Sequence, residues 1–128
     1  MLMNPAVYAK LLGEKIDECN TEVYLINTGW IAGGYGVGER IKLSYTREMV
    51  NAVINDKLGN VEFYEHPVFK LLIPSTCPNV PTEVLNPREL WNDKEAYDKK
   101  ALELAESFKE NFKKFKNVSE DILNAGIK

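Results

Sequence analysis

The sequence contains too little histidine and cysteine for most metal sites and disulfide frameworks. Its 128 residues include one histidine, His66, and two cysteines, Cys19 and Cys77. A histidine-based metal site needs further imidazoles, and the two cysteines lie too far apart in sequence for a compact zinc-binding motif. We expect two buried or half-buried free thiols, which suits a reducing cytoplasm, with a disulfide between them as the alternative. No metal ligand and no catalytic residue is predicted in this chain.

Long apolar runs and an excess of basic residues are also absent. No apolar run approaches the roughly 20 residues that a transmembrane helix requires. The 16 Lys and Arg and 19 Asp and Glu give a formal net charge of −3, so no general nucleic-acid surface is expected. Hydrophobic residues make up 45%, which allows a real core. We therefore expect one domain over residues 1–128, with neither a membrane nor a nucleic acid as partner.

Glycine, in contrast, is concentrated in one stretch. Five of the eight glycines lie between Asn27 and Arg47, at positions 29, 33, 34, 36 and 38. Glycine allows positive φ and lets the backbone approach a ligand closely. Freed backbone amides together with Arg40 and Arg47 would favour an anion. Residues 29–38, here called the glycine loop, therefore fit either a ligand-binding loop or a mobile surface loop.

Two common phosphate-binding motifs do not fit the glycine loop. Gly33 and Gly38 have the spacing of a Walker loop, but Glu39 stands where the lysine is needed and Arg40 where Ser or Thr holds magnesium. A carboxylate facing the phosphates would oppose binding. The dinucleotide pattern G-x-G-x-x-G fails as well, because residues 34–38 read G-x-G-x-G. Both motifs are rejected.

Hydrophobic periodicity predicts both helices and strands along the chain. Helices are expected near 5–19, 47–58 and 93–115, with a short last helix at 119–124. Strands are expected at 23–26, 40–43, 61–65 and 68–73. Val23–Ile26 is apolar throughout, which is typical of a strand buried on both faces. The predicted fold class is α/β, a mixed sheet with packed helices.

Capping residues and prolines predict where these elements end. Asn4 is expected to cap the first helix, Thr46 the second and Asn92 the long third one, with Gly59 as the stop of the second helix. The proline-rich stretch 74–88 is expected to lack regular structure. Arg88, at its end, is expected to form a structural ion pair rather than to contact a substrate.

Five motifs, in order along the chain, resemble the ATP-dependent phosphoenolpyruvate carboxykinases. They are N-P-x-x-Y-A-x-L-L-G-E-K at 4–15, NTGW with the glycine run and G-x-R-I-x-L-x-x-T-R at 27–47, P-V-F-K-L-L-I-P at 67–74, C-P-x-V-P-x-E-x-L-N-P-R-x-x-W at 77–91, and Y-x-x-x-A-x-x-L-A-x-x-F-x-x-N-F at 97–112. Each motif is weak alone, but the series is specific. The resemblance implies the C-terminal part of that family's C-terminal nucleotide-binding domain.

The resemblance also implies a reaction and three nucleotide contacts. The family converts oxaloacetate and ATP to phosphoenolpyruvate, ADP and carbon dioxide, a step of gluconeogenesis, with a divalent metal (Mg²⁺ or Mn²⁺). In its motif G-x-R-I-x-x-x-x-T the arginine, the apolar residue and the threonine contact the nucleotide, and these fall on Arg40, Ile41 and Thr46. A guanidinium can stack on a purine or bind phosphate, and a threonine hydroxyl can meet a base edge. Local roles also fit: a surface ion pair for Arg40 and a helix cap for Thr46.

The family's Walker loop and metal-binding residues have no counterpart in this sequence. The resemblance places them upstream, so the chain is expected to be part of a longer cytoplasmic enzyme and to be inactive alone. Its expected partners are a nucleotide and the remainder of that enzyme, and the isolated chain is expected to self-associate. Glu39 stands where family members often carry lysine, which changes the charge beside Arg40. The alternative is a stand-alone nucleotide-binding or interaction domain that reuses the fold.

Overall fold

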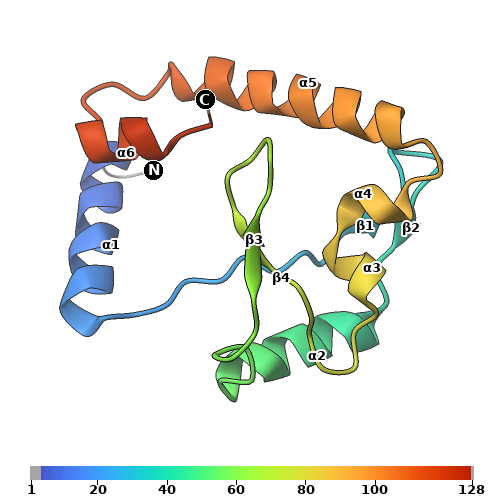
Figure 1. The fold of residues 1–128 in the computed structure, drawn as a ribbon. Coiled ribbons are helices and arrows are strands. Elements are labelled where there is room, and N and C mark those ends of the chain that lie inside the picture. Colours follow the sequence, from blue (N-terminus) through green and yellow to red (C-terminus); the bar gives the residue numbers. More distant parts are fainter. Residues whose placement is uncertain (1–3, 128) are drawn as a thin grey trace.

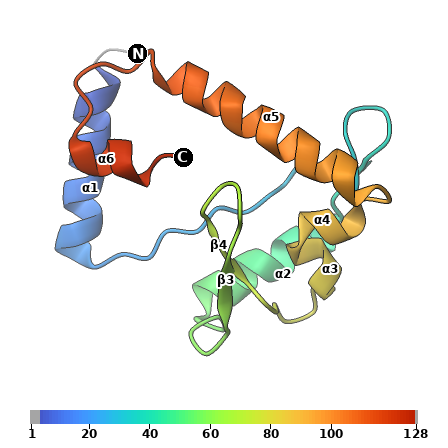
Figure 2. The ribbon, with the colours of Figure 1, turned by 45° about the horizontal axis from the view of Figure 1, so that its top comes forward.

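A computed structural model describes residues 4–127 as an open frame of helices around a small hairpin. The helices are α1 (Pro5–Cys19), α2 (Leu43–Ile54), α3 (Thr82–Leu85), α4 (Pro87–Leu90), α5 (Lys94–Phe112) and α6 (Glu120–Ala125), and the strands are β1 (Trp30–Ile31), β2 (Glu39–Arg40), β3 (Phe63–Glu65) and β4 (Leu72–Pro74). Figure 1 shows α1, α5 and α2 on three sides of the frame, with the β3–β4 hairpin between them. In both views α6 lies on the side of the frame that carries α1 (Figures 1 and 2).

Helices and strands are both present, but the predicted mixed sheet is not found among residues 4–127. The strands form two separate antiparallel pairs. In one pair Trp30 faces Arg40, and in the other Tyr64 faces Ile73. The predicted central strand at 23–26 has no strand partner here and is not assigned as a strand. The α/β class holds in its coarse form, helices with small antiparallel sheets, whereas the single mixed sheet was wrong for these residues because 23–26 pairs with no described strand.

The core is small and lies on the inner side of α2. Its buried residues are Ala52, Leu58, Cys77 and Val80. Partly buried side chains pack around them, namely Tyr45, Met49, Val53, Val61, Val84 and Leu85. Ala52 is the most buried of these, at 1% exposed. This core holds α2 against α3 and the loop at 77–80, and so fixes the helix that follows the glycine loop.

The first helix begins as predicted. The side-chain oxygen of Asn4 accepts a hydrogen bond from the Ala6 amide at 2.9 Å, and proline occupies the first turn. That turn leaves amides without helical partners, so the cap satisfies one of them. The helix ends at Asn20 in the left-handed conformation. Both cysteines are free thiols as predicted, but only Cys77 is buried: Cys19, the last helical residue, is exposed, so its predicted burial was wrong.

The predicted ends of the second helix were wrong. Helix α2 begins at Leu43 with Lys42 as its N-cap, which makes no side-chain cap bond. Thr46 lies inside the first turn, where its amide donates to the Lys42 carbonyl at 3.3 Å. The helix stops at Ile54 rather than near Gly59, and the Lys57 amide then donates to the Ala52 carbonyl at 2.8 Å. Side chains of this helix pack on the core, and this packing outweighed the local capping preference.

The later helices show two further differences and one confirmation. The proline-rich stretch does contain regular structure, because α3 and α4 begin at or just after prolines, a position that proline tolerates. The long helix α5 is capped by Asp93 rather than Asn92, with the Asp93 carboxylate accepting from the Ala96 amide at 2.9 Å. Arg88 is paired as predicted: its guanidinium donates to both oxygens of Asp98 at 2.8 and 2.9 Å. These bonds hold the pKa of Asp98 below its usual value.

The lone histidine is a structural link between the β3–β4 hairpin and α5. His66 is buried, and its Nε2 lies 3.0 Å from the Tyr97 hydroxyl. Its Nδ1 accepts hydrogen bonds from the amides of Val68 and Phe69, each at 3.2 Å. Two donors at Nδ1 require the neutral ring with its proton on Nε2. Burial accordingly lowers the pKa of His66.

We expect the stability of the chain to fall as the pH drops below about 6.5, the ordinary histidine pKa. Burial lowers the pKa of His66 in the folded state. As the pH falls from about 6.5 towards that lowered pKa, the unfolded state takes up a proton before the folded state does, and the free energy of unfolding therefore decreases. Melting temperatures compared at about pH 7.5 and about pH 5.5 should show this loss, since carboxylates remain mostly ionised over that range. The His66→Gln variant should lose most of the difference. An unchanged difference in that variant would assign the pH dependence to another group.

Candidate functional site

The glycine loop closes a β-hairpin that leads directly into α2. Strand β1 lies at the start of the glycine loop and pairs with β2, which directly follows the loop. Within it, the Gly34 carbonyl accepts from the amides of Val37 and Gly38 at 3.1 and 2.9 Å, and Gly36 has φ of 84°. Just beyond it, the Ile41 amide donates to the Gly29 carbonyl at 2.9 Å. The segment is thus strand–loop–strand, whereas a Walker loop connects a strand to a helix.

Two glycines in the loop are required by close backbone contact. A Cβ at Gly38 would lie 2.6 Å from the Gly33 carbonyl oxygen and 2.7 Å from that of Ile31. A Cβ at Gly33 would lie 2.9 Å from the Gly38 nitrogen. Gly34, by contrast, has open space around its Cβ position and no positive φ. The neck of the hairpin therefore requires glycine at 33 and 38, whereas Gly34 has room for a side chain.

We expect Gly38→Ala to distort this hairpin and Gly34→Ala to leave it intact. The new methyl group at 38 meets backbone oxygens that cannot rotate away, and such overpacking costs about 1–3 kcal/mol. Trp30 lies on β1 and its side chain is exposed, so its indole N–H signal in NMR, which is separate from that of Trp91, reports the hairpin. Thermal melting of the two variants followed at Trp30 and by circular dichroism makes the comparison. Equal melting of both variants would show that the neck adjusts freely.

The three residues predicted to contact a nucleotide follow one another from the hairpin into the helix. Arg40 ends β2 with an exposed side chain and makes no ion pair with any described residue, so the local role predicted for it, a surface ion pair, is not seen. Ile41 is 6% exposed, so only its edge could form an apolar wall. Thr46 is half-buried in the first turn of α2 and is not a cap. The guanidinium is thus the group best placed to meet an incoming ligand.

A shallow hollow of about 370 Å³ lies against α2 close to these residues. Its lining residues are Thr46, Arg47, Val50 and Asn51. All four residues belong to α2, so the hollow is an open face of one helix, and its hydroxyl, guanidinium and amide would bind a base edge or a phosphate only together with groups from other elements. Arg40 and Ile41 are not part of its lining. The structure therefore places Thr46, but not all three predicted residues, in one hollow, and sequence reasoning did not single out Asn51.

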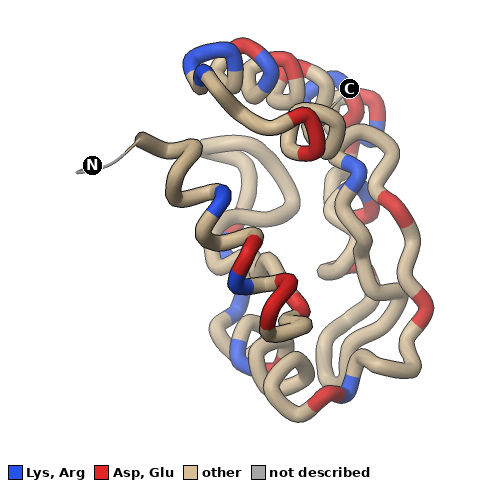
Figure 3. Tube along the Cα trace, turned by 90° about the vertical axis from the view of Figure 1, so that its left-hand side faces the viewer, with Lys and Arg blue, Asp and Glu red and all other residues tan. Residues whose placement is uncertain are grey.

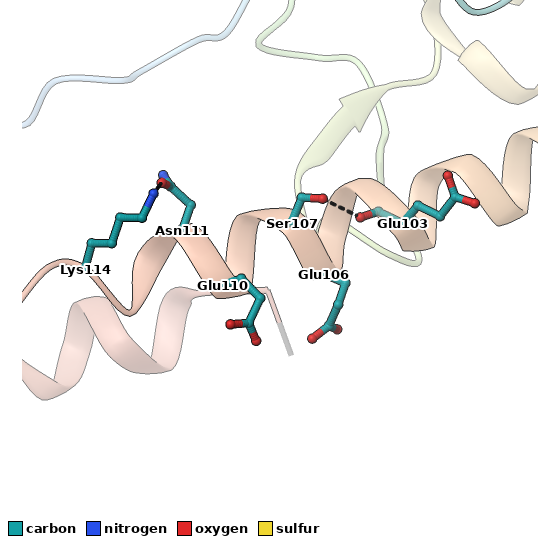
Figure 4. Close-up of a pocket in the computed structure, with 6 residues that line it drawn as sticks. All are labelled: Glu103, Glu106, Ser107, Glu110, Asn111 and Lys114. Carbon is teal, nitrogen blue, oxygen red and sulfur yellow. Dashed lines mark hydrogen bonds between the residues drawn. The ribbon is translucent and has the colours of Figure 1, made fainter.

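A second hollow, of about 880 Å³, lies along α5 and carries no site. Glu103, Glu106, Ser107, Glu110, Asn111 and Lys114 line it. All come from one helix and its end, and Figure 4 shows the side chains spread along that helix rather than converging. The Ser107 hydroxyl is already bonded to the Glu103 carbonyl at 2.9 Å. This is a solvated helix face.

Within residues 4–127, neither a concentration of like charge nor a cluster of ligand side chains indicates a metal site. No group of three His, Cys, Asp or Glu side chains in that range could hold an ion. Figure 3 shows basic and acidic residues interspersed along the chain. The residues here therefore do not fit a divalent metal.

None of the described helices is both long and apolar enough to cross a membrane.

Comparison with known proteins identifies the family. The phosphoenolpyruvate carboxykinase family model matches residues 1–83. The chain is 58% identical over 124 residues to the ATP-dependent enzyme of Caldanaerobacter subterraneus subsp. tengcongensis, covering 97% of this chain and 24% of that protein. It is 57% identical over 128 residues to that of Alkaliphilus oremlandii, covering 100% and 24%, and 61% identical over 120 residues to that of Lysinibacillus sphaericus, covering 94% and 23%.

The family model and the alignments with these relatives each cover most of this chain. The chain itself spans about a quarter of the length of the curated relatives it matches. The hairpin, the exposed Arg40 and the hollow at α2 all fall within the residues that the family model matches. The chain belongs to the ATP-dependent phosphoenolpyruvate carboxykinase family.

Proposed function

We propose that this chain is the C-terminal portion of an enzyme that converts oxaloacetate and ATP to phosphoenolpyruvate, ADP and carbon dioxide. The observation that carries the proposal is 58% identity over 124 residues with a protein named for that activity. The same identity favours an enzyme portion over a stand-alone interaction domain. The reaction would serve gluconeogenesis in the cytoplasm.

Within that enzyme, the hairpin and α2 would form one wall of the C-terminal nucleotide-binding domain, on the adenine side of ATP. Arg40 would stack on the base or bind phosphate oxygens, and Thr46 would offer its hydroxyl from the hollow. Ile41, being largely buried, would shape the wall from behind. The divalent metal would be held by residues outside this chain, because the side chains described here do not fit it.

The remainder of the enzyme would be the main protein partner. Large apolar side chains stay exposed on several elements, including Leu11 and Leu12 of α1, Leu72 of β4, and Leu102 and Phe108 of α5. Exposed apolar surface of this kind marks an interface. In isolation the same surface would drive self-association of the chain.

A chimaera tests the proposal. The 124 aligned residues of the Caldanaerobacter subterraneus enzyme are replaced by this chain, and phosphoenolpyruvate formation from oxaloacetate and ATP is measured. We expect turnover within about tenfold of the parent enzyme, because 58% identity preserves most contacts. The 128-residue chain alone should show no turnover, since phosphoryl transfer depends on metal ligands, and residues 4–127 contain no group of side chains that could hold a metal ion. A folded but inactive chimaera would overturn the proposal.

A further inference from the structure

Residues 22–28, here called the linking segment, join α1 to β1 without any secondary structure. The segment follows an extended course across the frame in both ribbon views (Figures 1 and 2). No backbone amide or carbonyl within it is hydrogen-bonded to another described residue. Leu25 is 81% exposed and Val23 is 65% exposed. The least polar run of the sequence thus lies open to solvent.

The side chains of the linking segment suit the centre of a sheet. In an extended chain, successive side chains point to opposite faces. Val23 and Leu25 therefore fall on one face, and Tyr24 and Ile26 on the other. A strand at a protein surface has one polar face, whereas a strand with layers on both sides is apolar on both. The unpaired amides and carbonyls add a template for hydrogen bonding to a neighbouring strand.

Resting on the proposed function, we infer that the linking segment is a β-strand completed by strands from the rest of the same carboxykinase polypeptide. The neighbouring strands must also lie between two covering layers, because residues 23–26 present apolar side chains to both faces of the sheet. The described strands offer no such partner: they have two or three residues each and already pair with one another. The relatives extend to about four times this length, which provides the necessary chain.

This pairing would also position the glycine loop. Just after the apolar run, the Asn27 side chain accepts from the Gly29 amide at 2.8 Å and donates to the Trp30 carbonyl at 3.3 Å. These bonds attach the end of the linking segment to the base of the hairpin. In open α/β sheets, ligands bind beyond the carboxyl ends of the strands. A strand fixed by residues outside this chain would therefore hold the binding loop inside it.

Hydrogen exchange tests the inference directly. The amides of residues 23–26 are followed in the 128-residue chain and in the chimaera described above, without nucleotide. We expect exchange about a hundredfold or more slower in the chimaera, because an amide bonded within a sheet exchanges only on opening. Equal, fast exchange in both would overturn the inference. Protection in the chain alone that grows with concentration, together with dimers in sedimentation, would also overturn it and assign the pairing to a second copy.

A matched pair of proline variants gives a second test. Leu25→Pro removes an amide that has no partner in this chain but would have one in a sheet. Lys116→Pro makes the same change in another exposed segment whose amide is also unbonded here. Both should leave the circular dichroism of the 128-residue chain unchanged. In the chimaera, only Leu25→Pro should lower the melting temperature or prevent folding, and equal melting of the two variants would overturn the inference.

The inference and the proposed function fail separately. Amide hydrogen exchange at residues 23–26 and the melting temperatures of the proline variants can both be measured without nucleotide and without turnover. An inactive chimaera with protected amides at 23–26 would contradict the proposed function alone. An active chimaera with fast-exchanging amides there would contradict the strand alone.

Discussion

In the active chimaera, Arg40→Ala should weaken ATP binding about ten- to a hundredfold, the equivalent of losing a hydrogen bond to a charged group, roughly 1.5–3 kcal/mol. The exposed guanidinium at the end of β2 has no ion-pair partner among residues 4–127, so the substitution removes no such contact from the chain itself. Titration with a fluorescent ATP analogue measures the affinity. Oxaloacetate affinity, taken from its KM, should change much less.

Three further variants make this experiment specific. Arg40→Lys keeps the charge but not the planar guanidinium, so it should recover only part of the affinity. Lys42→Ala removes an equal charge two residues away, from an ammonium that lies 5.6 Å from the Tyr45 ring centre, and should have little effect. Thr46→Val should cost about 0.5–1.5 kcal/mol of binding, the net value of a neutral hydrogen bond. Thr46 is not a helix cap, so the melting temperature of the Thr46→Val variant should stay unchanged. If Arg40→Ala weakens the binding of oxaloacetate and not that of ATP, Arg40 lies on the oxaloacetate side of the site.

The second large effect is expected in the core beneath this site. Leu58 is 5% exposed and packs with Ala52, Cys77 and Val80. Its truncation in Leu58→Ala should lower the free energy of unfolding by about 2–5 kcal/mol, the range for buried leucine. Small domains are stable by only about 5–15 kcal/mol, so the variant should be partly unfolded at moderate urea. Equilibrium urea denaturation followed by circular dichroism measures the difference.

Leu102→Ala is the matched control for this variant. Leu102 lies on α5 and is 61% exposed, and alanine is the better helix former. The same chemical change there should alter the unfolding free energy by no more than about 0.5 kcal/mol, as for most surface substitutions. If both variants lose the same stability, the cluster around Leu58 is not the core of the chain.

Local signals in the sequence determined the family and much of the helical structure. Asn4 followed by proline predicted the start of α1, and the apolar spacing after residue 93 predicted α5, because caps and periodicity act within a few residues. The ordered motifs predicted the carboxykinase family, which the comparisons confirm. The pairing expected for Arg88 also followed from local composition and is confirmed. The roles of Arg40, Ile41 and Thr46 stay predictions.

Only the tertiary structure decided how these elements meet. It showed that the glycine loop closes a hairpin whose neck requires Gly33 and Gly38, since backbone contact distances cannot be read from composition. It moved the start of α2 from Thr46 to Leu43, because packing on the Ala52 cluster outweighs a capping preference. It also left Val23–Ile26 unpaired, although its sequence is that of a buried strand. Strand pairing depends on residues distant in the chain, so the sequence could predict the strand but not its partner.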